Sequence, residues 1–365
     1  MAAYRQALSS SIGPESVVLD LGTGTGMMAM LALRYGAKRV YAIEPLDVIQ
    51  VARETAAANG LQDRIVFIQG LSSRTSLPER VDLIVEDMRG SLPWYGTHLS
   101  DAIDARRRFL KPGGRIISAR DTAYCAVVQA DERFRKQFGP WQIRIEELDL
   151  TAASHYAANS FASSLGTMEN LTPGTAWASI DYATVESPHA HGHIDLSVTR
   201  EGTAHGLLLW FDGELVPGVT ISNAPGQDDT VYGRRFYPWP QAVPLKAGDQ
   251  IAVDIRADLV GGDYVWTWTS GVRFRGEQGR ADLNFRQSTF LGTPMTRETL
   301  SRRASEHRPR LNAEGHVARF VLERMQGAMP LREIASQLAI EHADRFRSQR
   351  EALDYVASLS GSYGK

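Results

Sequence analysis

The stretch Val18-Leu19-Asp20-Leu21-Gly22-Thr23-Gly24-Thr25-Gly26 decides the fold of the first part of the chain. A short apolar strand runs into three closely spaced glycines, and an apolar helical pattern follows directly. A chain that turns sharply and lets a ligand touch its backbone cannot carry β-carbons there. The free N–H groups and positive dipole end of the following helix suit a carboxylate. The stretch therefore predicts a strand–turn–helix ligand loop built on Gly22, Gly24 and Gly26, with Asp20 either binding ligand or orienting the loop.

Strand and helix patterns alternate beyond this loop. We expect strands at 17–21, 39–43, 64–69, 81–85 and 115–118, and helices at 27–35, at 47–59 with Asp47 as its cap, and from 100 or 101 to 110. This alternation is typical of a mostly parallel sheet covered by helices on both faces. Glu44 closes the second strand, with Pro45 after it, and lies 24 residues after Asp20. An acid at this point can accept hydrogen bonds from both hydroxyls of a ribose.

The spacing of the glycines separates two kinds of nucleotide site. Dinucleotide enzymes usually carry G-x-G-x-x-G, whereas this chain has G-x-G-x-G directly after Asp20. A later turn, Lys111-Pro112-Gly113-Gly114, completes the pattern before the fifth strand. We therefore expect S-adenosyl-L-methionine as the cofactor and a methyltransferase rather than an NAD-dependent enzyme.

Composition excludes several other classes. The 365 residues carry 40 basic and 42 acidic side chains, and the formal net charge of −2 argues against a general electrostatic grip on nucleic acid. The single cysteine, Cys125, allows neither an internal disulfide nor a thiolate zinc site, and no metal is expected. The sequence shows neither an apolar run of about 20 residues nor a signal-peptide pattern. We expect a cytoplasmic protein that does not enter a membrane.

The pattern changes twice along the chain. After residue 120, short β-like runs separated by Gly, Pro and Asn indicate an antiparallel barrel or sandwich; they lie at 123–128, 193–198, 206–211, 250–255 and 264–269. Residues 152–166 read as a helical excursion or a loop. The last section has helical periodicity. The expected architecture is an α/β Rossmann-like domain over 1–120, an antiparallel β-barrel domain over 121–300 and a small helical module over 309–365.

Residues 4–275 resemble the protein arginine methyltransferases. The resemblance is carried by Val18–Gly26, by Gly36-Ala37-Lys38-Arg39-Val40 and by the turn at Lys111, and in the barrel by His205-Gly206 with Trp210-Phe211-Asp212. It implies a cofactor domain followed by a barrel, with the substrate between them and a homodimer formed through an arm inserted in the barrel. It also places Ser72, with Ser73, against the adenine.

The acceptor loop departs from this family. The family binds guanidinium with two glutamates; here the segment Glu86-Asp87-Met88-Arg89-Gly90-Ser91 puts Asp87 at the first position, and Gly96 takes the second. The Thr-His-Trp motif of the barrel becomes Thr230-Val231-Tyr232. A planar cation is best held by paired carboxylates. Loss of the second carboxylate therefore weakens both the binding of a guanidinium and the orientation of its attacking nitrogen. We expect Asp87 to be the catalytic carboxylate. Glu86 could supply the second only if the loop shifts, because neighbouring strand residues point to opposite faces.

Other candidates lie near this loop. His98 is either a catalytic base or a surface residue that starts a helix. Arg89 either pairs with Asp87 or binds a substrate carboxylate or phosphate, and Tyr95, with Trp94, forms an aromatic wall or part of the core. Tyr232 and Arg234 belong to the segment 232–239, which reads as a surface for an acidic substrate or as an exposed basic hairpin.

The helical end is similar to the helical half of the peptide chaperone of pyrroloquinoline-quinone biosynthesis, over 317–338. Peptide recognition, a structural or dimerising tail, and DNA contact stay open for it. The chain as a whole is expected to transfer a methyl group to a nitrogen or oxygen atom of a small-molecule, peptide or protein acceptor. The alternatives are a protein arginine N-methyltransferase with an altered acceptor loop, and an inactive scaffold that holds a peptide or a partner enzyme.

Overall fold

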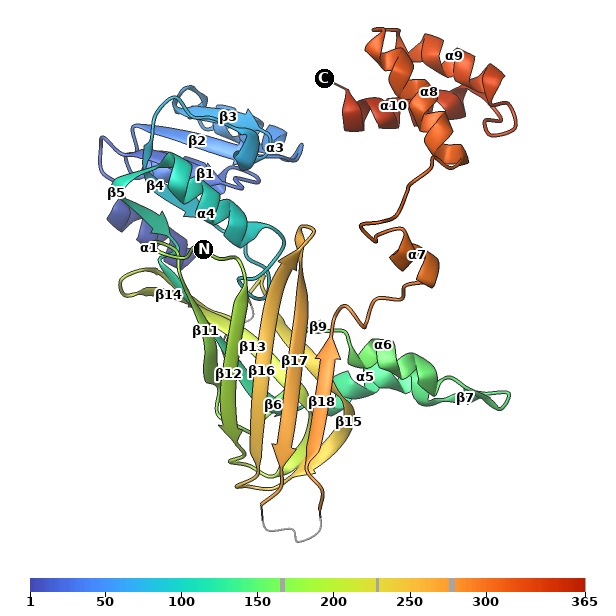
Figure 1. The fold of residues 1–365 in the computed structure, drawn as a ribbon. Helices are drawn as coiled ribbons and strands as arrows, with labels where there is room; N and C mark the ends of the chain where they lie inside the picture. Colours follow the sequence, from blue (N-terminus) through green and yellow to red (C-terminus); the bar gives the residue numbers. More distant parts are fainter. Residues whose placement is uncertain (165–167, 228–229, 276–279, 365) are drawn as a thin grey trace. The chain divides into compact units, whose positions relative to one another are not determined.

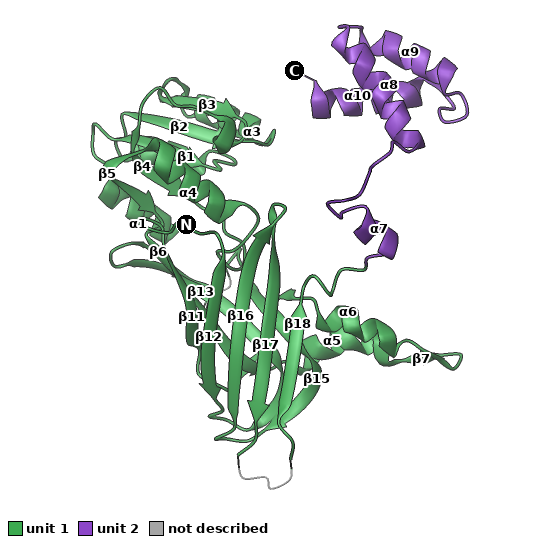
Figure 2. Ribbon diagram, in the orientation of Figure 1, with its two compact units in different colours: residues 1–294 green, residues 295–365 purple. Residues whose placement is uncertain are grey.

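The computed structural model describes residues 1–164, 168–227, 230–275 and 280–364. The chain forms two compact units, Met1–Pro294 and Met295–Lys365, shown in green and purple in Figure 2. The predicted boundary at residue 120 lies where the last parallel strand ends and the first antiparallel strand begins (Figure 1). The three-domain division itself stays a prediction.

The first unit begins with the expected parallel sheet. Its strand order is β3-β2-β1-β4-β5, and all the pairings between these strands are parallel. The strands are β1 (Val17–Leu21), β2 (Arg39–Glu44), β3 (Ile65–Gln69), β4 (Val81–Glu86) and β5 (Leu110–Ile117); the helices and 3-10 turns among them are α1 (Ala2–Ser11), α2 (Met27–Arg34), α3 (Ile49–Ala58), η1 (Gln62–Arg64), η2 (Ser72–Arg74) and α4 (His98–Phe109). The carboxyl ends of parallel strands lie at the same edge of a sheet. The glycine loop after β1, Glu44 at the end of β2 and Glu86 at the end of β4 therefore lie close together at that edge.

Two local expectations were wrong, and a third feature differs in its surroundings. Asp47 does not cap α3, whose N-cap position is Val48 without a side-chain hydrogen bond; its carboxylate instead accepts from the Gln69 amide at 2.8 Å. Helix α4 starts at His98, earlier than predicted. The segment 111–114 is assigned to β5 but bulges out of it, because Leu110 pairs with Val81 and Arg115 already pairs with Leu83, so the predicted turn residues form an irregularity inside the strand.

The antiparallel part of the first unit consists of two main sheets. One contains β6 (Arg120–Gln129), β9 (Ala162–Ser164), β10 (Glu169–Asn170), β11 (Thr175–Asp181), β13 (Gly202–Val216), β14 (Val219–Ser222) and β15 (Arg234–Leu245). The other has the order β12-β16-β17-β18, over Ala190–Ser197, Gln250–Val260, Asp263–Arg273 and Leu283–Ser288. Burial alternates along β17, as expected for strands with one face in the core. The shared core is rich in tryptophan and includes Trp177, Trp239, Trp266 and Trp268.

A helical arm is inserted between β6 and β9. It consists of α5 (Asp131–Gln142), β7 (Arg144–Ile145), β8 (Leu148–Asp149), η3 (Thr151–Ala153) and α6 (Ser154–Ala158), and it projects beside the sheets in Figure 1. The excursion thus starts before the segment 152–166 that the sequence left open. Its exposed apolar side chains are Trp141, Ile143, Ile145, Leu148 and Tyr156.

The second unit is helical, as predicted. It contains α7 (Arg297–Ser301), α8 (Ala313–Gln326), α9 (Leu331–Glu341) and α10 (Gln349–Tyr363). Val317, Ile334 and Val356 lie in its core. The resemblance of this unit to a peptide chaperone stays a prediction. None of the helices in the described part of the chain is long and apolar enough to span a membrane.

The seam within the first unit positions the site. The hairpin of β13 and β14 places Leu215 and Val219 in the same core as α1 and α2. In the other direction, Trp94 from the loop after β4 packs against Trp177, with ring centroids 4.9 Å apart. The loop between β4 and α4 is therefore held by the antiparallel sheets as well as by its own sheet.

Candidate active site

The glycine loop has the conformation that its sequence predicts. Gly22, Gly24 and Gly26 all have positive φ, which disfavours any other residue. The Gly22 N–H donates to the Ile43 carbonyl at 2.9 Å, and Gly26 is the N-cap of α2. A β-carbon on Gly24 would meet nothing within 4 Å, so the backbone there borders open space. The N-cap Gly26 has no side chain to bind the first turn of α2, and Asp20 occupies only the Ala29 N–H, which leaves the N–H groups of Met27 and Met28 available to a ligand.

Asp20 and Glu44 hold the loop from two sides. The buried Asp20 carboxylate accepts from the Ala29 N–H at 2.8 Å and from the Thr23 hydroxyl, and burial raises its pKa to about 6. Glu44 accepts from the Gly24 N–H at 3.1 Å and from the Leu46 N–H at 3.0 Å. Asp20 thus points into the loop, whereas Glu44 lies at its rim.

The other predicted cofactor residues frame this rim. Pro45 follows Glu44 and is exposed. Ser72 is buried at the start of η2, where its carbonyl accepts a hydrogen bond from Arg108. Contact of either residue with a cofactor stays a prediction.

The cofactor loop touches the acceptor loop. A β-carbon on Gly22 would lie 2.7 Å from Cγ of Met88, so a larger residue would displace the Met88 side chain, and the φ of +72° also favours glycine. Met88 directly follows Asp87. The structure therefore brings the glycine loop and the predicted acceptor carboxylate together.

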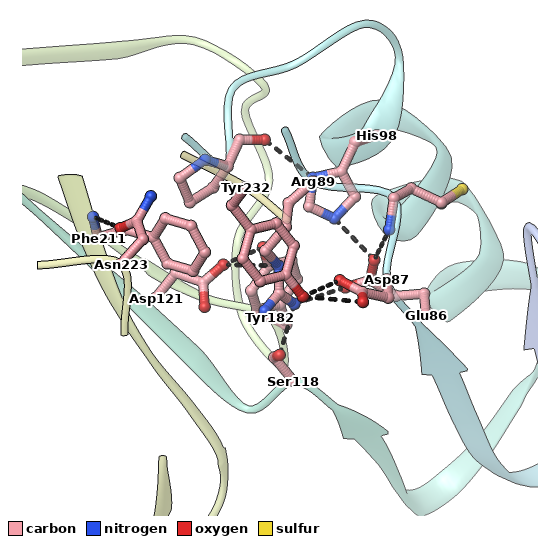
Figure 3. Close-up of polar contacts among 12 residues, drawn as sticks. Glu86, Asp87, Arg89, His98, Ser118, Asp121, Tyr182, Phe211, Asn223 and Tyr232 are labelled. Atoms are coloured by element: carbon pink, nitrogen blue, oxygen red, sulfur yellow. Dashed lines mark hydrogen bonds and ion pairs between the residues drawn. The ribbon is translucent and has the colours of Figure 1, made fainter. Parts of the chain in front are cut away.

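Asp87 is bridged to the antiparallel sheets by Tyr232. The phenol oxygen lies 2.8 Å from each carboxylate oxygen, across a sequence separation of 145 residues (Figure 3). Both side chains line a pocket of about 430 Å³, together with Arg89, Gly90, Ser91, Tyr95, Phe161, Ser163, Val231 and Arg235. The predicted juxtaposition of Asp87 with the barrel segment at Tyr232 is thus present.

Glu86 points away from this pocket into a buried ion pair. Its Oε2 lies 2.9 Å from Nε2 of His98, and both side chains are almost fully enclosed. Burial alone would raise the pKa of Glu86, but the charge and hydrogen bond of His98, with Arg89, hold it at about 2. The same pairing raises the pKa of His98 against the opposing effect of burial. His98 is therefore neither at the surface nor on the loop: it starts α4 and faces inward.

Arg89 does not pair with Asp87 as one prediction had it. Its guanidinium lies 3.5 Å from Glu86 and 3.5 Å from Asp121, and it donates to the Ser118 hydroxyl. The side chain is fully buried, so its ion pairs are internal to the protein (Figure 3). Asp121 in turn accepts from the Tyr182 hydroxyl at 2.7 Å. This cluster fixes the end of β4 against β6.

Of the remaining candidates, one lines the pocket and the others lie behind it. Trp94 is core, whereas Tyr95 is 52% exposed, covers Gly90 and lines the pocket. Arg234 donates to the carbonyls of Asn223 and Ala224, at 2.7 and 3.1 Å, and is not among the described residues that line the pocket.

Two further residues support the pocket: Asn223, which the sequence reading passed over, and Arg235, which it included only as part of the segment 232–239. Asn223 joins the loops by donating from its amide to the Ser91 carbonyl at 3.0 Å. Arg235 lines the pocket directly. Strand alternation could have indicated Arg235, because neighbours in a strand face opposite sides and Arg234 is turned away.

Models of two protein families match the chain. A methyltransferase domain matches residues 18–114, and the arginine methyltransferase oligomerization subdomain matches residues 119–259. The two matches meet at the seam between the parallel and antiparallel sheets, and together they cover the glycine loop, the acceptor loop and the arm.

Curated relatives carry the same combination. The chain is 29% identical over 237 residues to a probable protein arginine N-methyltransferase 6 of Arabidopsis thaliana, covering 62% of this chain and 54% of the relative. It is 28% identical over 257 residues to protein arginine N-methyltransferase 6 of Xenopus laevis, covering 67% of this chain and 73% of the relative. It thus spans about half the length of the first relatives that it matches.

Solved structures show the same fold. The Trypanosoma brucei PRMT1 enzyme-prozyme heterotetrameric complex with AdoHcy superposes with a TM-score of 0.72, at 20% identity, over 79% of this chain and 93% of that one. Protein arginine methyltransferase 10 of Arabidopsis thaliana gives a TM-score of 0.68 at 20% identity, with the same coverage. A Rossmann-like sheet joined to antiparallel sheets with an inserted arm defines a branch of the class I methyltransferases. Together, the two family matches and the curated relatives support a protein arginine methyltransferase-like member of that class.

Proposed function

We propose that the chain transfers a methyl group from S-adenosyl-L-methionine to a nitrogen or oxygen nucleophile bound beside Asp87. The observation that carries the proposal is the contact between Gly22 and Met88, which joins the glycine loop to the acceptor loop. A methyl donor over one loop would face an acceptor held by the other. Transfer by direct displacement depends on such proximity and alignment.

The residues of the first loop fit this cofactor. Open space at Gly24 admits a ligand against the backbone, and the uncapped start of α2 offers N–H donors to the carboxylate of its amino-acid moiety. Glu44 lies beside Gly24, where an acid can bind ribose hydroxyls. When bound, the cofactor supplies a methyl group that its sulfonium already activates.

The chain's own residues would position the acceptor. The nucleophile's lone pair forms the new bond to the methyl carbon, the electrons of the S–C bond remain on sulfur, and the acceptor's proton leaves to the Asp87 carboxylate or to water. Tyr232 holds that carboxylate through its single hydroxyl proton, which is shared between the two carboxylate oxygens. Orientation and exclusion of water, rather than activation of the donor, are the tasks left to the protein.

The test is transfer of labelled methyl from S-adenosyl-L-methionine into an extract of the source cell, fractionated by size. Asp87→Asn should lower transfer at least 100-fold while cofactor affinity, measured by calorimetry, stays unchanged. Asp195→Asn is the matched control, because this carboxylate is 76% exposed on β12, outside the residues lining the pocket. Equal transfer by wild type and Asp87→Asn would remove Asp87 from the mechanism.

Arginine methylation is the second candidate, favoured by the names of the curated relatives. In the chain itself, the position of the second glutamate is Gly96, with φ of +49° and open space around it. Label found in protein bands, and released as methylarginine by acid hydrolysis, would establish it. Label confined to small molecules would exclude it.

The inactive scaffold makes a different prediction about the cofactor. A decayed pocket would give no thermal stabilisation, whereas a functional one gains about 2.7 kcal/mol at a cofactor concentration 100 times Kd. Absence of both thermal stabilisation by the cofactor and transfer to any extract fraction would favour the scaffold.

We also propose that the chain forms a homodimer through the arm. The oligomerization subdomain match includes the arm, and apolar side chains such as Trp141 and Ile145 are exposed on it. Exposed apolar groups gathered on one projecting element are typical of an interface. Sedimentation equilibrium measures the mass directly.

A further inference from the structure

Arg235 is a buried cation in the wall of the acceptor pocket. It is 5% exposed, and its guanidinium carbon lies 4.3 Å from the Phe161 ring centroid and 5.4 Å from that of Trp266. The Tyr237 hydroxyl is its polar neighbour, with a pKa that burial raises to about 12 although Arg235 opposes the rise. The aromatic rings therefore pack against the guanidinium but bring no negative charge.

The other buried arginines nearby have carboxylate or carbonyl partners within the protein. Arg89 lies between Glu86 and Asp121, and Arg234 donates to backbone carbonyls. Across residues 1–164, 168–227, 230–275 and 280–364, by contrast, no carboxylate pairs with Arg235. Its buried Nε, like that of Arg89, has no hydrogen-bond acceptor, so Arg235 differs from Arg89 in lacking a partner of opposite charge. A buried charge without a partner is costly to keep, so such a group indicates a partner that arrives with a ligand.

The position of Arg235 says where that partner binds. Arg235 and Asp87 line the same pocket of about 430 Å³, and the Arg89 side chain is enclosed by its own ion pairs. Among the described residues that line the pocket, the charged side chains that face it are thus one carboxylate, Asp87, and one guanidinium, Arg235. A ligand with only a cationic group would satisfy Asp87 and leave Arg235 unpaired.

We propose that the acceptor carries a carboxylate, which Arg235 binds while the nucleophile lies at Asp87. The inference rests on the proposed methyl transfer and names its substrate class. A carboxylate matches the planar fork of a guanidinium in a bidentate pair. The rings of Phe161 and Trp266 pack on the guanidinium and so leave its N–H edge for such a partner. Arg235 thereby distinguishes this pocket from one built for a free guanidinium.

The test measures binding of simple carboxylates to the full chain saturated with S-adenosylhomocysteine. The probes are benzoate, 3-phenylpropionate and N-acetylglycine, each compared with its primary amide by calorimetry or ligand-observed NMR. The wild type should bind at least one carboxylate ten times more tightly than its amide. Arg235→Gln should abolish this preference, and Arg235→Lys should keep part of it. Arg273→Gln, an equal change of charge at an exposed site on β17, should keep all of it.

The outcomes separate the two proposals. A preference in the wild type that Arg235→Gln removes, with thermal melting of the variant unchanged or raised, supports the inference. Equal binding of acid and amide by the wild type, no binding of any carboxylate, or an unaltered preference in Arg235→Gln would each overturn it. Failure of S-adenosylhomocysteine to bind the wild type counts instead against the proposed methyl transfer. Transfer of label into a neutral or cationic small molecule would overturn the carboxylate and leave the transfer standing.

Discussion

Replacing His98 by glutamine tests the buried pair that supports the acceptor loop. Glu86 and His98 face each other at 2.9 Å with almost no exposure, so the substitution leaves a buried carboxylate with Arg89, at 3.5 Å, as its remaining charged partner. The glutamine amide can still donate a hydrogen bond but carries no charge. Removing one member of a buried pair costs about 3–5 kcal/mol.

The pKa of Glu86 gives the net effect of burial, which raises it, and of His98, Arg89 and the Met88 N–H, which lower it. Lowering it from 4.5 to about 2 corresponds to about 3 kcal/mol, at about 1.36 kcal/mol per pKa unit. We therefore expect His98→Gln to lower the free energy of unfolding at pH 7 by about 3 kcal/mol. His191→Gln is the control, because His191 is 61% exposed and lies 3.7 Å from Asp254. Its effect should stay within about 0.5 kcal/mol.

The dependence of stability on pH follows from the directions in which the pKa values of Glu86 and His98 are shifted. The folded pKa of Glu86 is lowered, so its contribution is present above about 4.5 and is lost as pH falls toward about 2. The folded pKa of His98 is raised, so its contribution is complete below about 6.5 and is lost as pH rises through the folded value. Urea titrations from pH 3 to 9, followed by circular dichroism, should show both limbs in the wild type and lose the alkaline one in His98→Gln. Identical stability and pH profiles for the two proteins would refute the ion pair.

Three further predictions concern the loops and the arm. Tyr232→Phe removes the hydroxyl that holds Asp87 and should lower methyl transfer roughly 10-fold in the label assay, since a hydrogen bond to a charged group contributes about 1.5–3 kcal/mol; unchanged transfer would show that the bond is dispensable. Gly22→Ala should weaken calorimetric cofactor binding because its β-carbon meets Met88, and adding Met88→Ala should restore part of the affinity; no rescue by the double variant would mean that the φ of +72° alone is responsible. Ile145→Asp on the arm should convert dimer to monomer in sedimentation equilibrium, and a persistent dimer would move the interface elsewhere.

The cofactor half of the site could be predicted from sequence because its chemistry is local. Gly22, Gly24 and Gly26 report their own backbone conformation, and the strand and helix patterns around them determine where that turn lies. Glu44 follows from the end of the adjacent strand. These features need no knowledge of distant contacts.

The part of the site around Asp87 depends on contacts between residues far apart in the sequence, which a local sequence pattern does not reveal. The sequence could place Asp87 and Tyr232 on facing segments through family spacing, but it could not pair Arg89 with Asp121, from β6. His98 looked like a surface residue because polarity alone does not reveal a buried partner. Of the two arginines in the segment 232–239, the sequence singled out Arg234 rather than Arg235, since the choice between them depends on which face of β15 meets the pocket.

The interleaved cores at the seam limit how this protein can be taken apart or recombined. Leu215 and Val219 complete the core under α1 and α2, while Trp94 completes the core of the antiparallel sheets. A fragment ending near residue 118 would expose one core and strip the acceptor loop of its anchor. Exchanging whole halves between relatives would therefore change this packing interface together with the substrate specificity. Changes of substrate in this lineage are expected to arise instead by point substitutions where the parallel and antiparallel sheets meet.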